Sequence, residues 1–134
     1  MSSTDATPPP PANPTGTLAW LDLTIADAPG IRDFYSSVIG WQPEPVAMGE
    51  YDDYSMKAPE GTVVAGVCHA RGENADLPPQ WLVYVMVDDL DASLQRCAAG
   101  GGTQISTVRG AGPGSFCVIR DPAGAVLALM QRPE

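Results

Sequence analysis

Few side chains in this sequence have types and spacing suited to chemistry, and the first of them lie on a segment that alternates like a β-strand. Along residues 18–25, Trp20 and Asp22 share one face, while Leu21 and Leu23 share the other. A carboxylate in an apolar setting has a raised pKa and can donate or accept a proton. Asp22 is therefore the candidate catalytic residue, although it could equally anchor a ligand amine or lie at an edge without a role.

Cys68 and His69 are a second candidate pair, but they are direct neighbours in the sequence. In a strand their side chains point to opposite faces, whereas a Cys–His nucleophile pair needs both groups on one side. The sequence leaves open which of the two faces inward. With Cys97 and Cys117, Cys68 makes an odd, widely spaced set that matches neither a disulfide framework nor a zinc-site spacing.

The elements that must position these residues follow from periodicity and capping residues. After the strand at 18–25, Asp27 is typical of a helix N-cap, and Gly40 ends the helical spacing. Short strands are expected near 46–48, 54–58 and 62–70, with Asp52-Asp53 as a turn. The same order returns about 62 residues later: a strand at 81–87, Asp89 as the cap, Gly102 as the stop, and strands near 104–108, 115–119 and 125–131.

This recurrence predicts two βαβββ modules, residues 17–70 and 81–131, joined by a polar linker at 71–80. They form a single domain over 17–131, preceded by a Pro-rich tail at 1–16 that we expect to be disordered. The fold class is then α+β. The two modules pair into an eight-stranded open barrel with a central cleft, and their helices lie outside.

Strand alternation sorts the residues that we expect to line this cleft and bind a ligand. They are Trp20, Asp22, Tyr54, Met56, Leu82, Tyr84, Met86, Cys117, Ala128 and Met130, and the strand phase of Tyr54, Met56 and Cys117 is the least certain. Trp20 and Tyr84 could stack on a planar or cationic ligand. Trp20 could also simply fill space.

The strand, Asp27, Phe34-Tyr35 and the run 38–41 resemble the first-half signature of the vicinal oxygen chelate superfamily, which contains glyoxalases, bleomycin-type resistance proteins and extradiol dioxygenases. Residues 87–91 and 121–124 resemble its second-half signatures. Members that use a metal carry one ligand on each of four cleft strands. The resemblance places these ligands at Trp20, Leu82, Ala128 and either Ala65 or Gly66. None of these side chains can coordinate a divalent cation, so we expect no metal and no cofactor.

The net charge of −9 speaks against a nucleic-acid partner and suits a neutral or cationic small molecule. No apolar run is long enough for a membrane span and no signal segment is present, so we expect a cytoplasmic protein without a membrane partner. The resemblance also implies a homodimer.

Three functions remain open. The first is sequestration of a small molecule in a metal-free cleft, as in resistance proteins. The second is a metal-independent lyase or isomerase that uses Asp22, Tyr84 or His69. The third is an interaction module with a vestigial cleft.

Overall fold

The computed structural model describes residues 14–133, which form two compact units. The first unit is Trp20–Val83, and the second contains residues 14–19 and 84–133. Most of the expected tail, residues 1–13, lies outside the described part.

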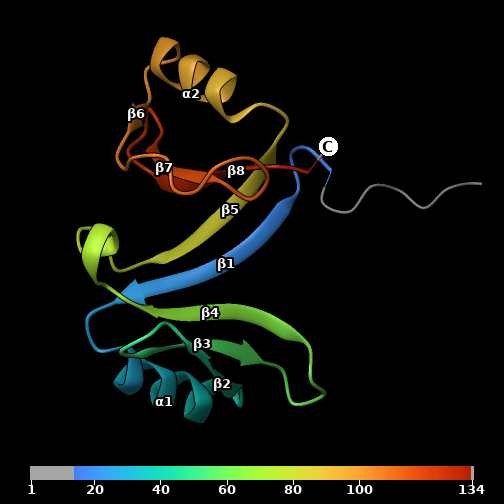
Figure 1. Ribbon diagram of the computed structural model, residues 1–134, viewed down its shortest axis with the longest axis vertical. Helices are drawn as coiled ribbons and strands as arrows, with labels where there is room; N and C mark the ends of the chain where they lie inside the picture. The colour runs from blue at the N-terminus through green and yellow to red at the C-terminus, as the bar shows by residue number, and fades with distance from the viewer. Residues whose placement is uncertain (1–13, 134) are drawn as a thin grey trace, which may run out of the picture. The chain divides into compact units, whose positions relative to one another are not determined.

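The first unit contains most of β1 (Leu18–Ile25), and all of α1 (Ala28–Ile39), β2 (Gln42–Ala47), β3 (Asp52–Lys57) and β4 (Val63–His69). The strand order is β2-β3-β4-β1, with β1 parallel to β4 and the other pairs antiparallel. A short 3-10 turn, η1 (Gly72–Asn74), follows β4 within the expected linker. Figure 1 shows α1 along one side of β2 and β3.

Local capping residues set both ends of α1. The side chain of Asp27 accepts a hydrogen bond from the backbone N–H of Gly30 at 3.1 Å. Gly40 ends the helix in the left-handed conformation, at φ 91°, which glycine adopts without a steric cost. Ala28 at the start of α1, Met56 on β3 and Val67 on β4 are fully buried and form the core of this unit.

The second module repeats this pattern with β5 (Trp81–Val87), α2 (Leu90–Ala99), β6 (Thr103–Gln104), β7 (Phe116–Arg120) and β8 (Val126–Gln131). The strand order β5-β8-β7-β6 again has its parallel pair between the first and last strands of the module. Asp89 caps α2 through the N–H of Ala92, at 3.1 Å. The α+β class and the duplicated βαβββ order are therefore confirmed.

Several expected boundaries differ from the structure. Asp52-Asp53 is not a turn, because both residues pair with β2 at the start of β3. The strand expected near 104–108 shrinks to the two residues of β6, and α2 ends at Gly100 rather than at Gly102. Residue 16, which was assigned to the tail, is held by the second unit, since Gly16 N–H donates to the carbonyl of Met86 at 2.8 Å.

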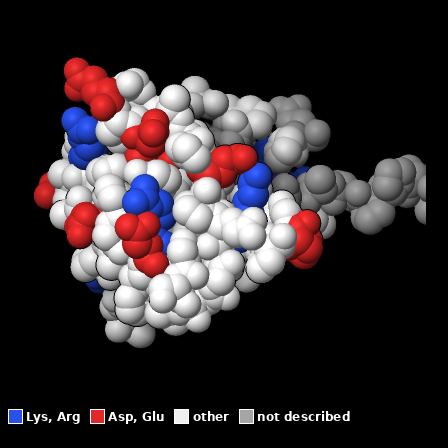
Figure 2. Space-filling view, turned by 90° about the horizontal axis from the view of Figure 1, so that it is seen from below, with Lys and Arg blue, Asp and Glu red and all other residues white. Residues whose placement is uncertain are grey.

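Among the residues that the structure describes, no helix is long and apolar enough to cross a membrane. Figure 2 shows acidic and basic side chains mixed on one face of the molecule, with no continuous basic patch there. This distribution agrees with the excess of acidic residues in the sequence.

Candidate functional site

The side of the first sheet that lies away from α1 carries the polar residues of this unit. Alternation along β1 directs Leu23 and Ile25 toward α1, where both line a small pocket with Phe34. Trp20 and Asp22 consequently lie on the opposite side. We call this side, with its residues Trp20, Asp22, Asp53, Gly66 and Cys68, the Trp20 face.

Trp20, Asp22 and Gly66 form one packed group on the Trp20 face. The indole Nε1 of Trp20 donates a hydrogen bond to Oδ2 of Asp22 at 3.2 Å. Asp22 pairs with Gly66 across the β1–β4 ladder, and a Cβ at Gly66 would lie 3.2 Å from the indole carbon Cζ2 of Trp20. The indole therefore lies against bare backbone and fills the space that a side chain on β4 would otherwise occupy.

Cys68 lies on the same face, which answers the question that its adjacency to His69 left open. Burial raises the pKa of the Cys68 thiol, and the negative charges of Asp22 and Asp53 raise it further. Both carboxylates are therefore close to this thiol. A thiol in such surroundings stays protonated and is a poor nucleophile.

His69 is engaged by Asp53 rather than by Asp22. Oδ1 of Asp53 accepts the backbone N–H of His69 at 2.9 Å and lies 3.3 Å from its Nδ1. The ring of His69 also meets the ring of Tyr51 edge-on, with the two centroids 5.1 Å apart. His69 is thus part of a local contact at the end of β4.

Tyr54 and Met56, which were expected in the cleft, lie on the α1 side instead. Tyr54 pairs with Val67 and Met56 with Ala65, so both share the face of the core. Met56 is fully buried there, and the guanidinium of Arg32 on α1 lies 4.8 Å from the centre of the Tyr54 ring. The alternation that places Asp53 on the Trp20 face necessarily turns Tyr54 away from it.

The second unit has a matching sheet face, and this one is apolar. Tyr84 and Met86 on β5 share it with Met130 and Ala128 on β8, through the pairs Tyr84↔Ala128 and Met86↔Met130. Phe116, which the sequence analysis missed, pairs with Met130 and meets the ring of Tyr84 edge-on at 5.2 Å. The alternation of side chains along β7 could have placed Phe116 on this face.

Cys117 and Leu82 complete the expected set. Cys117 pairs with Leu129, so it lies on the other side of β7 from Phe116. There it is fully buried, close to Cys97 of α2, and burial raises the pKa of its thiol. Its expected place in the cleft is therefore corrected. Leu82 precedes Tyr84 by two residues on β5 and is also buried.

The positions where metal-using relatives carry ligands do not fit a metal in this chain. On β1 the position holds Trp20, and on β4 it holds either Ala65 or Gly66. The indole of Trp20 packs across Gly66. The side chains of Leu82 and Ala128 in the second module are hydrocarbon and cannot coordinate a metal ion. Within residues 14–133, no group of three or more His, Cys, Asp or Glu is arranged to hold a metal ion.

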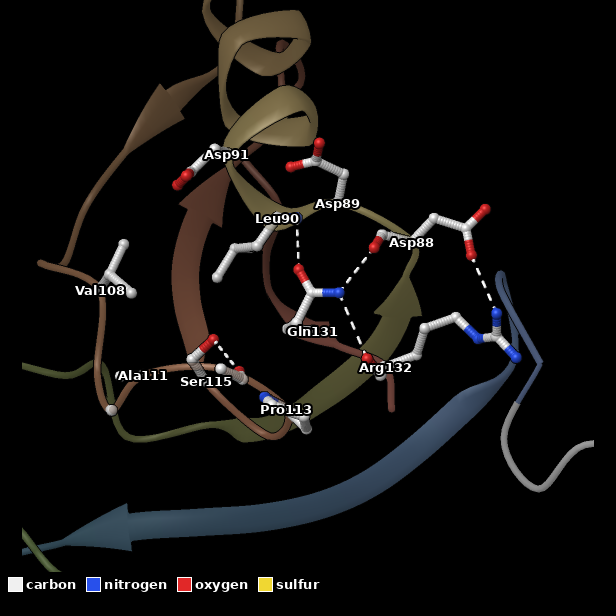
Figure 3. Close-up of a pocket in the computed structure, with 12 residues that line it drawn as sticks. Asp88, Asp89, Leu90, Asp91, Val108, Ala111, Pro113, Ser115, Gln131 and Arg132 are labelled. Carbon is white, nitrogen blue, oxygen red and sulfur yellow. Dashed lines mark hydrogen bonds and ion pairs between the residues drawn. The ribbon is translucent and has the colours of Figure 1, made fainter. Parts of the chain in front are cut away.

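A separate pocket of about 510 Å³ lies beside the start of α2, within the second unit (Figure 3). Asp88, Asp91 and the glycine-rich loop 110–113 line it. Its polar groups are largely used within the protein. Gln131 accepts the N–H of Leu90 at 2.8 Å and donates to the carbonyl of Asp88 at 2.6 Å, and Asp88 pairs with Arg132 at 3.2 Å (Figure 3).

The family profile described as "Glyoxalase-like domain" matches residues 20–130. "Putative glyoxylase CFP32" of Mycobacterium tuberculosis is 34% identical over 87% of this chain and 46% of its own length. "Anthracycline biosynthesis protein DnrV" of Streptomyces peucetius is 30% identical over 89% of this chain and 42% of its own length. The chain thus spans about half the length of these relatives.

Solved structures share the fold at low identity. Methylmalonyl-CoA epimerase from Mycobacterium tuberculosis is 17% identical, with a TM-score of 0.52 and 89% of each chain covered. The Mn(II)-bound glyoxalase from Novosphingobium aromaticivorans is 18% identical, with a TM-score of 0.53, over 87% of this chain and 39% of that one. Both share the fold of this chain.

Proposed function

Because the chain belongs to the glyoxalase-like domain family, with residues 20–130 matching its profile, we propose that it binds a small organic molecule on the Trp20 face of its first unit without a protein-bound metal. The molecule is held rather than converted, as in sequestration or resistance. The Trp20 face supplies polar and aromatic groups for this contact.

One observation carries this proposal. The Trp20 indole lies across Gly66 and donates its N–H to Asp22. The resemblance places metal ligands at Trp20 on β1 and at either Ala65 or Gly66 on β4. An indole and a bare glycine cannot coordinate a divalent cation, but a fixed aromatic ring beside a carboxylate can contact an organic molecule. The local chemistry therefore favours organic recognition.

The similar proteins support a small-molecule ligand in general terms. The name of the Streptomyces peucetius relative assigns it to anthracycline biosynthesis, and a methylmalonyl-CoA epimerase of the same fold has been solved with methylmalonyl-CoA (TM-score 0.53, 11% identical). These ligands and pathways belong to those proteins. They support the proposal that this chain also binds an organic compound.

Turnover by a metal-independent lyase or isomerase is the weaker candidate. His69 is engaged by Asp53, the Cys68 thiol is kept protonated, and Tyr84 packs against Phe116. Asp22 remains as the residue from which catalysis would have to start, and its hydrogen bond from Trp20 favours a binding role.

A thermal-shift screen of a metabolite and drug library tests the proposal, using protein dialysed against EDTA. A ligand at about 100 times its Kd stabilises the folded state by about 2.7 kcal/mol, which raises Tm by several degrees. We expect at least one such compound, with no loss of that compound on incubation. The proposal fails if no compound stabilises the protein, or if stabilisation requires a stoichiometric divalent ion.

Cytoplasmic location and a homodimer are further parts of the proposal, and they rest on the sequence and on the resemblance alone. Light scattering of the purified chain measures the molar mass in solution and decides the second point. A mass of one chain at micromolar concentration would exclude a stable dimer.

A further inference from the structure

The Trp20 indole is fixed before any ligand arrives. Its Nε1–H is held by Asp22 at 3.2 Å, and its six-membered ring lies over the backbone of Gly66. Trp20 as a whole residue is only partly buried. A ring that is ordered in advance loses little conformational entropy on binding, and its face attracts flat rings and cations.

Negative charge is concentrated beside this ring. Asp22 is 9% exposed and the Asp53 side chain 15% exposed, and both carboxylates act on the thiol of Cys68. Strand register places both carboxylates on the Trp20 face, where Asp22 is nearly buried and Oδ1 of Asp53 lies 3.3 Å from Nδ1 of His69. Electrostatic interactions are stronger there than on an open surface.

Lys57 and Arg32 of the first unit form ion pairs on other elements: Lys57 with Glu44 at 2.8 Å on β2 and β3, and Arg32 with Asp33 at 2.9 Å on α1. Arg71 lies over the ring of Tyr51, 4.0 Å from its centre, at the His69 end of β4. The net charge of the whole chain is −9. An anionic ligand would meet repulsion at the Trp20 face, whereas a cation would be attracted.

We propose that the ligand of the Trp20 face is an organic cation with a flat aromatic ring, which stacks on Trp20 and places its charge near Asp22. This inference rests on the proposed function and adds the ligand class. It also gives Gly66 a role: the missing side chain lets the indole lie flat against β4.

The experiment compares three probes by isothermal titration calorimetry with the full chain. Proflavine is a planar cation, anthracene-9-carboxylate is a planar anion of similar size, and tetraethylammonium is a cation without a ring. We expect proflavine to bind at least about tenfold more tightly than either of the others, because only proflavine offers both features.

Variants locate the binding. Asp22→Asn keeps an oxygen that accepts the Trp20 N–H but removes the charge, and we expect it to weaken proflavine binding about tenfold. Gly66→Ala leaves the charges in place but displaces the indole, so it should also weaken proflavine binding. Asp91→Asn is the matched control, since it removes the same charge from the pocket beside α2. Thermal unfolding of each variant establishes that it is folded, and the Asp22 and Gly66 substitutions test the site independently.

Each outcome has a distinct meaning. The ligand class is wrong if anthracene-9-carboxylate binds as tightly as proflavine, if proflavine does not bind, or if neither Asp22→Asn nor Gly66→Ala weakens it. It is also wrong if Asp91→Asn abolishes binding, because the probe would then occupy the pocket beside α2. The proposed function survives all of these results if a neutral or anionic library compound stabilises the protein and Trp20→Leu removes that effect. If no compound binds, both the ligand class and the proposed function are wrong.

Discussion

The indole N–H of Trp20 is bound to the carboxylate of Asp22, two residues further along the same face of β1. The contact links an aromatic ring to a nearly buried acid. It lies beside Gly66, which has no side chain to displace the ring. The predictions below follow from this relationship and from the packing on either side of the sheet.

Gly66→Ala should destabilise the protein by about 1–3 kcal/mol, because the added methyl group would lie 3.2 Å from both the Trp20 ring and the Cβ of Asp22. Urea unfolding measures the change in free energy. In a Trp20→Leu background part of this cost should disappear, since one of the two crowded neighbours is removed. An equal cost in both backgrounds would mean that the ring does not rest on Gly66.

Met56→Ala should lower stability by about 2–5 kcal/mol without weakening ligand binding, because Met56 is fully buried on the α1 side of the sheet. Chemical denaturation and a ligand titration below the unfolding transition measure the two effects. The control is Val64→Ala on β4, where the side chain is 37% exposed and the change should stay within about 0.5 kcal/mol. A large loss of affinity in folded Met56→Ala protein would show that Met56 lies on the ligand-binding face after all.

Cys68 should react slowly with iodoacetamide in the folded protein at pH 8, because burial and two nearby carboxylates raise its pKa. Peptide mass spectrometry measures the rate, and the same protein in urea provides the reference.

The folded state holds this thiol proton more tightly than the unfolded chain does. Stability is therefore fully present below about pH 8.5, where an ordinary thiol is protonated, and declines as the pH rises above it.

Cys68→Ser should make that decline shallower, with a remainder from Cys117, whose pKa is also raised by burial. Rapid alkylation of Cys68 in the native state, or a pH dependence that the substitution leaves unchanged, would contradict the placement of Asp22 and Asp53 around it.

Gln131→Ala should cost about 1–3 kcal/mol, because the side chain accepts the N–H of Leu90 and donates to the carbonyl of Asp88 at the start of α2. Thermal unfolding provides the measurement. Gln95→Ala, at an exposed position of the same helix, should change stability by less than about 0.5 kcal/mol. Similar costs for both variants would show that the contacts of Gln131 contribute little.

The parts of the fold that depend on local signals could be predicted from the sequence. Asp27, Gly40 and Asp89 set helix ends through contacts within a few residues, and each has the predicted capping role. The duplication was visible because the same signals return at a nearly constant offset. Trp20 and Asp22 were placed on one face by alternation within a single strand.

The rest depended on strand register, which the sequence does not determine. Asp52-Asp53 was assigned to a turn, so the start of β3 was misplaced. The sequence then did not determine which side chains of β3 lie on which side of the sheet, and Tyr54 and Met56 were placed on the wrong side. The face of Cys68 could not be decided until its charged neighbours were known. The contact between Asp53 and His69 joins residues of two strands and has no signal in either one.

The most direct test of the central claim is an NMR titration of ¹⁵N-labelled protein in EDTA with the strongest stabiliser from the library screen. The chain has three tryptophans, Trp20, Trp41 and Trp81, and Trp20→Phe identifies the indole signal of the first. We predict that the Trp20 indole N–H shifts and saturates with the ligand, while the N–H of Trp81, which is bonded to Tyr35, moves little. A ligand that saturates the protein without moving the Trp20 signal, or that binds only after a divalent ion is added, would contradict the account.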